Sequence, residues 1–433
     1  LRNGASGNVI GTNGDGNGDN SEGNLISGNA HNGVVISGQG TDNNQIAGNY
    51  IGINGNGSAA LPNVLVGVNI FGGAANNRIG TDNDGVSDAA EANVISGNLR
   101  SGISINTSSD NVITGNYIGT NQGGGLMLGN GDHGINIVAS DPGGQANNNW
   151  IGGLTLDTGN LIAFNQKSGV QLSGNAIQNP IVYNSIHSNV GPGINLLGPN
   201  SGGELYGITH NDIGDGDSGS NDLLNFPELT NALVVNNTVS IAGEIVDGLP
   251  NTAFTVQFFA NDMCDLGNHG EGQTYIGETV VNTDGSGYVG FLSNFNQSVS
   301  AGSYITATAT NNSNTSEFSE CFEVESGQQL QGELPPDFSV TPNRNINCRY
   351  ACTTLSAIAD TLLEGIVYVP LGYDPQTGYF MFAGPSFGET CYAAPVAGGT
   401  PLMALEVDGL TIEPDEIASI GIDLFSCPAF STP

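Results

Sequence analysis

The sequence predicts an all-β protein whose first half is a parallel β-helix. Two short phrases, Gly-x-x-Ile and Asn-x-Ile, recur through the first 225 of its 433 residues. Such self-similarity at short spacing is typical of solenoids. The chain contains 67 Gly, yet 38% of its residues are hydrophobic and they recur at fixed places in the phrases. This regularity indicates a folded core instead of disorder.

The Gly-x-x-Ile phrase places aliphatic residues at its second and fourth positions. Side chains alternate between the two faces of a strand, so these aliphatics should point inward. Stacked coils should then form two buried columns. The first is Val34, Val68, Ile103, Ile135, Val170 and Ile194; the second is Ile36, Ile70, Ile105, Ile137, Leu172 and Leu196. The third positions should face outward: Val35, Asn69, Ser104, Asn136, Gln171 and Asn195.

The Asn-x-Ile phrase interleaves with the first and gives each unit three short strands. It begins at Asn24, Asn44, Asn93, Asn111 and Asn160. Three strands with one apolar face each close into a triangular coil, whose backbone pairs with the coils above and below. Gly and Asn suit the corners because they tolerate left-handed backbone. Stacked Asn side chains should hydrogen-bond along the axis. We expect about seven coils between residues 8 and 215, a rod ~35 Å long.

These phrases resemble the right-handed parallel β-helix repeat of large secreted and surface proteins of bacteria. The resemblance covers residues 1–225 and implies right-handed coils. It does not identify a function, because lyases, hydrolases, tail fibres and adhesins all use this fold.

Longer alternating segments replace the repeat after residue 225. They include Val239–Gly243, Phe254–Phe259 and Tyr304–Ala309, with turns such as Thr283–Gly287 between them. This pattern predicts an antiparallel β-sandwich over residues 226–326. Three short segments resemble the sandwich module that often follows this repeat in bacterial surface proteins: Phe258–Asn261, Gly270–Gln273 and Thr315–Phe318.

The remaining chain divides into a linker and a third domain. Residues 327–337 are polar and end in Pro335-Pro336, which predicts a linker. Residues 338–433 resemble a bacterial SH3-like domain, a small five-stranded barrel, with a C-terminal extension. The resemblance rests on Asn345–Arg349, Thr361–Gly365, Val369–Gly372 and Cys391-Tyr392. The family often has Trp near or at the places where this chain has Tyr379, Phe380 and Tyr392, so the resemblance does not extend to the family's aromatic groove.

The cysteines indicate an oxidising compartment, and hence a secreted, extracellular or cell-surface protein. All six lie outside the repeat: Cys264, Cys321, Cys348, Cys352, Cys391 and Cys427. An even number without paired Cys-x-x-Cys spacing favours disulfides, with a zinc site as the alternative. Cys264 and Cys321 should pair because the sandwich has no other cysteine. The SH3-like resemblance implies Cys348 with Cys391, which leaves Cys352 with Cys427.

Charge excludes several partners. Lys and Arg number 6 against 41 Asp and Glu, a formal net charge of −35. Such a chain cannot neutralise nucleic-acid phosphates, and anionic membranes are disfavoured for the same reason. No apolar run reaches the 18 residues of a membrane span. The chain begins with Leu1 almost inside a repeat, so we expect a leader or further sequence before it.

Acidic loops are the strongest chemical signal, and they predict calcium binding. Hard oxygen ligands at alternate positions, with Gly between them, suit Ca²⁺. The alternative is a solvated turn, since turns use the same residues, and no loop has the full EF-hand spacing. The candidate ligands are Asp82, Asp84, Asp88 and Glu91, then Asp15, Asn17 and Asp19, and finally Asp215 and Asp217.

Catalytic patterns are not visible in the repeat. A lyase needs a cation near the reacting carbon, but Arg2, Arg78, Arg100 and Lys167 are expected to share no repeat column. A glycosidase needs paired carboxylates, whereas the outward third positions are neutral. We therefore expect a structural or adhesive protein, not an enzyme. Unpaired strand edges on a terminal coil would invite self-association into a filament, sheath or surface layer.

Two alternatives remain open. The first is a carbohydrate-binding adhesin, in which the SH3-like domain holds cell-wall polysaccharide and exposed aromatic rings stack on sugars. The candidate rings are Tyr50, Tyr117, Trp150, Tyr183 and Tyr206. The second is a polysaccharide-degrading enzyme.

Overall fold

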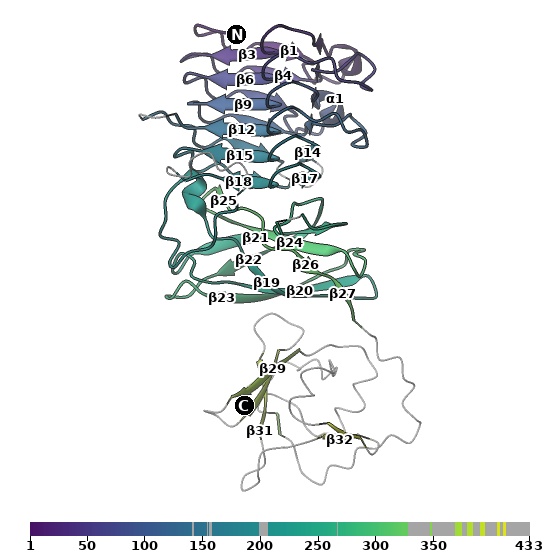
Figure 1. The fold of residues 1–433 in the computed structure, drawn as a ribbon, viewed down its shortest axis with the longest axis vertical. Helices are drawn as coiled ribbons and strands as arrows, with labels where there is room; N and C mark the ends of the chain where they lie inside the picture. Colours follow the sequence, from purple (N-terminus) through teal and green to yellow (C-terminus); the bar gives the residue numbers. More distant parts are fainter. Residues whose placement is uncertain are drawn as a thin grey trace. The chain divides into compact units, whose positions relative to one another are not determined.

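The structure is a computed structural model of the whole chain. It describes residues 1–140, 143–153, 155, 158–198, 207–265 and 267–327, together with six strands between residues 347 and 412. The chain forms two compact units, Leu1–Gly327 and Gln328–Pro433. The first unit holds a stack of short parallel strands followed by longer antiparallel ones (Figure 1).

Three parallel sheets of six strands each build the first part of this unit, as in a right-handed parallel β-helix. Sheet 1 contains β1 (Val9–Gly11), β4 (Gln45–Ala47), β7 (Arg78–Gly80), β10 (Val112–Thr114), β13 (Trp150–Gly152) and β16 (Ile181–Val182). Sheet 2 contains β2 (Leu25–Ile26), β5 (Tyr50–Ile51), β8 (Val94–Ile95), β11 (Tyr117–Ile118), β14 (Leu161–Ala163) and β17 (Ser185–His187). Sheet 3 contains β3 (Val34–Ser37), β6 (Val68–Phe71), β9 (Ile103–Asn106), β12 (Ile135–Val138), β15 (Val170–Ser173) and β18 (Ile194–Leu196).

The helix has six coils, so the expectation of about seven was too high. The described residues between β18 and the next strand contain the short helix η3 (Ser220–Leu223) and no strand. Their sequence resembles the repeat only in part, because it lacks the alternating aliphatic residues of the earlier coils. Asn221 in η3 nevertheless accepts a hydrogen bond from the Asn179 N–H at 3.0 Å. An Asn of a seventh coil would accept the same bond.

The two predicted aliphatic columns are confirmed. Val34, Val68, Ile103, Ile135, Val170 and Ile194 stand in register along sheet 3, as do Ile36 and its equivalents through Leu196. All are at most 5% exposed, and they belong to one core. The third positions are partly exposed except Asn195, which is fully buried in the last coil. Its burial shows that something covers this end of the helix.

Three asparagine ladders run along the corners, which confirms the expected stacking. In each ladder the Nδ2 of one Asn donates to the Oδ1 of the Asn in the following coil, at 2.7–3.1 Å. The ladders are Asn8-Asn44-Asn77-Asn111-Asn149-Asn179, Asn24-Asn49-Asn93-Asn116-Asn160-Asn184 and Asn29-Asn63-Asn98-Asn130-Asn165-Asn189. The ladders therefore have a direction, with donors pointing towards the C-terminal end.

In one corner of the helix, left-handed backbone occurs one residue before each ladder position after the first. These residues are Asn43, Asn76, Asp110, Asn148 and Gln178, all with φ between 55° and 60°. The tight corner turn thus falls on the preceding residue, and the ladder Asn is free to stack.

The antiparallel part consists of two sheets packed face to face. One contains β19 (Glu228–Val235), β20 (Thr238–Ile245), β23 (Val289–Phe295) and β27 (Glu325–Ser326); the other contains β21 (Ala253–Asn261), β22 (Thr274–Asn282), β24 (Tyr304–Asn311), β25 (Asn314–Thr315) and β26 (Phe322–Glu323). Phe258 contacts the rings of Phe291 and Phe295 in a core separate from that of the helix. We call this part the sandwich.

The second unit contains a four-stranded antiparallel sheet and a hairpin. The sheet orders β28 (Asn347–Cys348), β31 (Thr390–Ala394), β30 (Tyr379–Ala383) and β29 (Val369–Asp374); the hairpin pairs β32 (Leu405–Val407) with β33 (Leu410–Ile412). The predicted SH3-like domain is described only by these six strands; the side chains of its cysteines and most of the predicted linker lie outside what the structure describes.

Candidate functional site

Two acidic loops have the same pattern of residues. The first acidic loop, residues 12–22, follows β1, and the second, residues 81–91, follows β7. Both read Thr-x-x-Asp-Gly-x-x-Asp-x-x-Glu, with η1 (Asp19–Ser21) ending one and α1 (Asp88–Glu91) ending the other. The sequence alone made the first loop a shorter version of the second, and aligning the two on their Thr extends the shared pattern over all eleven positions.

The shared pattern produces shared hydrogen bonds. Thr12 Oγ1 donates to Asp19 at 3.1 Å, as Thr81 Oγ1 does to Asp88 at 3.0 Å. Asn13 N donates to Glu22 at 3.2 Å, as Asp82 N does to Glu91 at 2.8 Å. The carboxylates of the second Asp and of the Glu in this pattern therefore fold their own loops.

Asp19 and Glu91 are poor candidates for metal ligands because, unlike Asp88, they are buried. Glu91 is fully buried, lies 3.4 Å from Arg78, and accepts a bond from Gln45 at 3.3 Å. Burial raises the pKa of the Glu91 carboxyl. Asp19 is 5% exposed, and a hydrogen bond from Ser87 in the second loop lowers its pKa. Asp19 therefore joins the two loops, and Glu91 ties the second loop to β7 and β4.

Three of the predicted ligands do come together. Each of Asp82, Asp84 and Asp88 offers a carboxylate oxygen, and these oxygens lie within 4.8 Å of one another at the surface of the second loop. Within the described residues this is the one such group. Asp82 also lies 3.4 Å from Arg78, which offsets part of the negative charge. In the first loop Asn13 stands where the second has Asp82, which leaves Asp15 and Asn17 with fewer charged neighbours.

The third acidic segment is more buried than expected. Asp215 is 9% exposed, and its Oδ1 accepts the Asn225 N–H at 2.9 Å. Burial, with the charges of Asp217, Asp212 and Asp222, raises the pKa of Asp215 to about 6. Burial likewise raises the pKa of Asp217, whose Oδ1 has no hydrogen-bond partner in the described part of the chain.

A corner of the helix carries an ion-pair column, which corrects the expectation that its cations share none. Lys167 Nζ lies 2.8 Å from Asp132 in the neighbouring coil, and Arg100 lies 3.5 Å from the same Asp132 from the other side. Each of these three residues lies two positions before the Gly of a Gly-x-x-Ile phrase. The column was hard to predict from the sequence because it mixes positive and negative side chains. Beside them, burial lowers the pKa of His133 to about 4, which keeps its ring neutral.

Several predicted sugar-stacking rings are occupied by internal contacts. Tyr183 donates to Glu278 in the sandwich at 3.0 Å, and its ring lies 5.6 Å from that of Tyr275. The Tyr50 hydroxyl donates to Gln122 at 3.2 Å. Tyr117 and Trp150 are partly exposed, and Tyr206 lies outside the described residues.

The sandwich completes the last coil of the helix, which sequence reasoning missed. The third ladder ends on Glu271, whose Oε1 accepts both the N–H and the Nδ2 of Asn189 at 3.0 Å. Glu317 accepts the Leu196 N–H at 2.8 Å and the Thr209 N–H at 2.7 Å. Gly272 forms an antiparallel bridge with Ile186. The side chains of Asn314, Thr315 and Gln257 accept the N–H groups of Gln178, Ile181 and Tyr183 in turn.

Apolar contacts close the same end. Phe318 and Phe259 of the sandwich belong to the core of the helix, with ring centroids 5.4 Å apart. A Cβ on Gly193 would lie 2.8 Å from the Phe318 ring, so glycine is required for this approach. Glu271, Thr315, Glu317 and Phe318 fall within two of the segments that carried the resemblance to a sandwich module.

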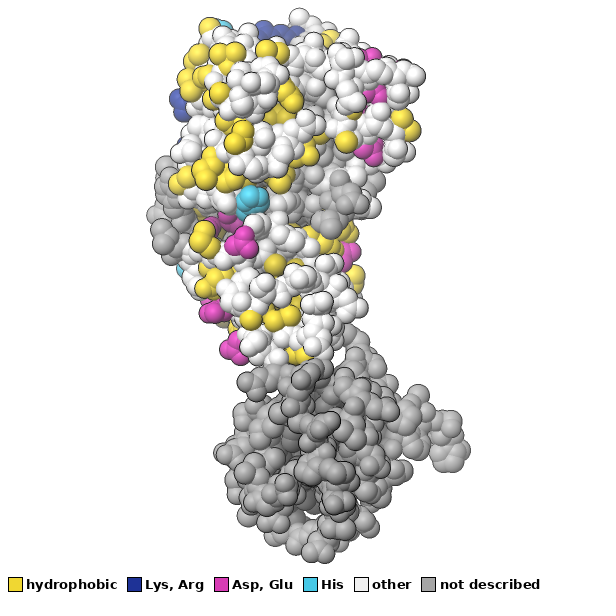
Figure 2. Space-filling model, turned by 90° about the vertical axis from the view of Figure 1, so that its right-hand side faces the viewer, with side chains coloured by type: hydrophobic (Ala, Val, Ile, Leu, Met, Phe, Trp, Pro, Cys, Tyr) yellow, Lys and Arg dark blue, Asp and Glu magenta, His cyan; other side chains and the backbone are white. Residues whose placement is uncertain are grey.

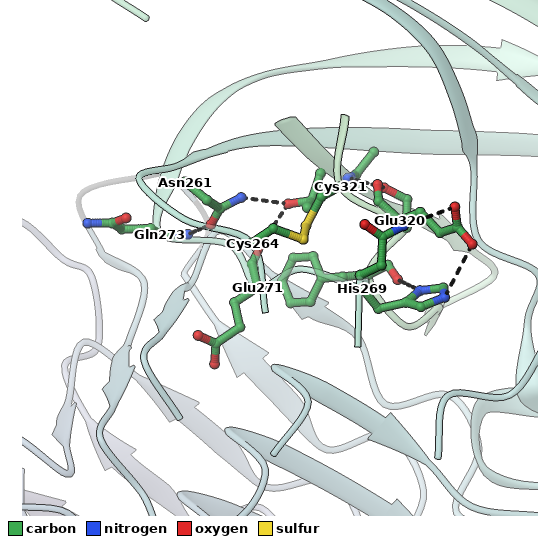
Figure 3. The surroundings of a disulfide bond; sticks show 12 residues. Asn261, Cys264, His269, Glu271, Gln273, Glu320 and Cys321 are labelled. Carbon is green, nitrogen blue, oxygen red and sulfur yellow. Dashed lines mark hydrogen bonds and ion pairs between the residues drawn. A yellow bond between two sulfur atoms is a disulfide. The ribbon is translucent and has the colours of Figure 1, made fainter. Parts of the chain in front are cut away.

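A disulfide holds the segment that carries Glu271 (Figure 3). It joins Cys264 and Cys321, the pair expected within the sandwich, with Cα atoms 6.0 Å apart. Nearby, Asn261 accepts the Gln273 N–H at 2.9 Å, and the Thr306 hydroxyl donates to the Glu271 carbonyl. In Figure 3 the Glu271 side chain points away from the disulfide. The disulfide therefore fixes the backbone from which this carboxyl reaches the helix.

Comparisons with known proteins identify no family. No protein-family model and no curated protein matches the chain. Among solved structures, it is similar to the enzymatically active domain of tailspike protein 2 of bacteriophage CBA120, at 11% identity and a TM-score of 0.17. That similarity covers 70% of this chain and 67% of the other, and a score this low carries no argument. The described residues contain no helix long and apolar enough to cross a membrane.

Proposed function

We propose that this chain is an extracellular structural or adhesive protein of the cell surface, whose helix and sandwich together act as a stiff scaffold. The observation that carries the proposal is the continuation of the asparagine ladders beyond the last coil. All three ladders run through the six coils; the third ends on Glu271 of the sandwich, and at the end of the first Asn221 in η3 accepts the backbone N–H of Asn179. Because buried amides without partners are costly, such ladders resist local opening.

The surface of the helix is consistent with this role. Its outward third positions are Val, Asn, Ser and Gln, and the face drawn in Figure 2 is mostly uncharged over the helix. Arg78, Arg100 and Lys167 each pair with a carboxylate of the same helix. These charges are therefore used in holding loops and corners together.

Within this proposal, Ca²⁺ binds the second acidic loop through Asp82, Asp84 and Asp88, whose oxygens are close enough to share one ion. A cation there would relieve the mutual repulsion of three carboxylates. It would thereby stiffen a loop that projects from the helix.

Self-association within this proposal would use the edge strands β1 and β2, because Leu1 and Arg2 already pair with β3. The opposite edge strands, β16, β17 and β18, are covered by the sandwich. On β1 and β2 the side chains of Val9 and Leu25 are 48% and 53% exposed. Exposed apolar edge strands favour pairing with another chain.

Electron microscopy and light scattering of the purified protein, with and without Ca²⁺, test this proposal. We expect end-to-end assemblies that the double change Val9→Lys with Leu25→Lys abolishes, because lysine on an edge strand blocks pairing. Leu99→Lys is the matched control, since Leu99 is 54% exposed elsewhere on the helix. Strictly monomeric wild-type particles, or assemblies that survive the double change, would contradict self-association through these strands.

Two other functions make different predictions. A carbohydrate-binding adhesin is supported by the partly exposed rings of Tyr117 and Trp150, and it predicts hits on a glycan array. A polysaccharide-degrading enzyme is supported by the Arg100-Asp132-Lys167 column beside His133, where cations and a neutral imidazole meet. It predicts release of unsaturated or reducing sugars from acidic polysaccharides, and loss of that release in Lys167→Met.

A further inference from the structure

Two buried carboxyl groups lie in the contact between the last coil and the sandwich. Glu271 is 6% exposed and Glu317 is 2% exposed. Each accepts backbone N–H groups that a seventh coil would otherwise satisfy. Among the described residues, neither carboxyl has a salt bridge to Lys, Arg or His. A buried carboxylate without a cation is costly, so these groups favour their protonated form.

The surroundings of both carboxyls offer no compensating charge. Facing Glu271 are Asp265 from the sandwich and the N–H groups of Asn189 and Ser188 from the helix. Glu317 meets the N–H groups of Leu196 and Thr209. The histidines nearby are engaged elsewhere: His187 with Ser188 at 3.1 Å, and His269 with Glu320 at 3.8 Å. Burial and the charge of Asp265 oppose ionisation of Glu271, and burial opposes ionisation of Glu317, while the facing N–H groups offset only part of that cost.

We infer that the contact between the last coil and the sandwich is a proton-controlled latch, closed most firmly while Glu271 and Glu317 hold protons and weakened when they lose them. Opening it uncovers the edge strands β16, β17 and β18. This inference does not depend on the proposed function, because it concerns only the stability of the contact. Burial raises the pKa of both carboxyls to about 8, in agreement with the geometry.

The direction of the pH effect follows from linkage. In the open state both carboxyls are solvated and return to the ordinary value of 4.5. The latch is therefore fully stable below pH 4.5, weakens as the pH rises, and stops weakening above about pH 8. Within that window the opening equilibrium constant rises by up to about tenfold per pH unit for each carboxyl.

Hydrogen exchange of the full chain between pH 5 and 9 tests the latch. The readout is the protection factor of the Asn189 and Leu196 amides, corrected for the intrinsic pH dependence of exchange. We expect protection at both amides to fall by at least tenfold between pH 6 and 8 and then to level off. The Ile118 amide, in a central coil, should keep its protection.

Glu271→Gln separates titration from packing, because Oε1 alone accepts both bonds from Asn189 and an amide oxygen can replace it. We expect this variant to lose most of the pH dependence at Asn189. Glu320→Gln is the control, since Glu320 is 67% exposed, and it should behave as wild type. Constant protection in the wild type, or an unchanged pH dependence in Glu271→Gln, would overturn the latch.

A second measurement serves if Glu271→Gln does not fold. Carboxyl-carbon NMR of the wild-type chain follows the ionisation of Glu271 and Glu317 directly. Midpoints above pH 7 support the latch, and midpoints near 4.5 for both groups refute it.

Discussion

A single asparagine in the middle of a ladder satisfies several buried groups at once. Asn116 donates to Asn160 at 3.0 Å and to the Ile79 carbonyl at 2.8 Å, and it accepts the Nδ2 of Asn93 at 2.9 Å. Asn116→Ala removes all three bonds, although Asn160 Oδ1 keeps the backbone N–H of residue 116 and Asn93 Nδ2 keeps the Ile46 carbonyl. We expect it to lower the free energy of unfolding by about 3 kcal/mol.

Chemical denaturation measures this loss, and Asn69→Ala is the matched control. Asn69 also lies in a central part of the helix, but it occupies an outward third position and is partly exposed. Its removal should change the free energy of unfolding by less than about 0.5 kcal/mol. Equal losses in the two variants would mean that the ladder contributes no special stability.

The asparagine ladders could be predicted from the sequence, but the acceptor at the end of the third ladder could not. Asn at fixed spacing predicted the ladders because their partners are copies of the same phrase. Glu271 could not be assigned in this way. Its partner, Asn189, lies 82 positions away in another type of fold. Only the resemblance of Gly270–Gln273 to a recurring module hinted at a role.

At the scale of elements, the second acidic loop makes a calcium prediction. If Ca²⁺ joins the oxygens of Asp82, Asp84 and Asp88, it stabilises the folded chain by about 2.7 kcal/mol at 100 times its dissociation constant. We expect calorimetric titration to show binding that Asp84→Asn weakens at least tenfold. Asp110→Asn, which changes an exposed carboxylate at a different corner, should leave the affinity unaltered. Absence of binding heat in the wild type would leave the loop as a solvated turn.

The elements of the helix were predictable because each strand is specified by its own phrase. The register followed from period-2 alternation, and both aliphatic columns are aligned as expected. The number of coils was not predictable, because the phrase Asn211–Gly214 looks like the start of another unit. The chain instead turns towards the sandwich, with Asn225 bonded to Asp212 and Asp215.

At the scale of the whole molecule, helix and sandwich behave as parts of one unit. Each has its own core, yet Phe259 and Phe318 belong to the core of the helix, and the sandwich supplies acceptors for the last coil. Unfolding the sandwich alone would leave the backbone N–H groups of β16, β17 and β18 that now donate to it without acceptors. We therefore expect the two parts to unfold together.

Isoleucine-methyl NMR during urea unfolding of the full chain tests that claim most directly. Ile118 reports on the core of the helix and Ile241 on the core of the sandwich, and both are fully buried. The account predicts that the native signals of Ile118 and Ile241 disappear at the same urea concentration and with the same slope. A sandwich signal that vanishes while the helix signal persists, or the reverse, would contradict it.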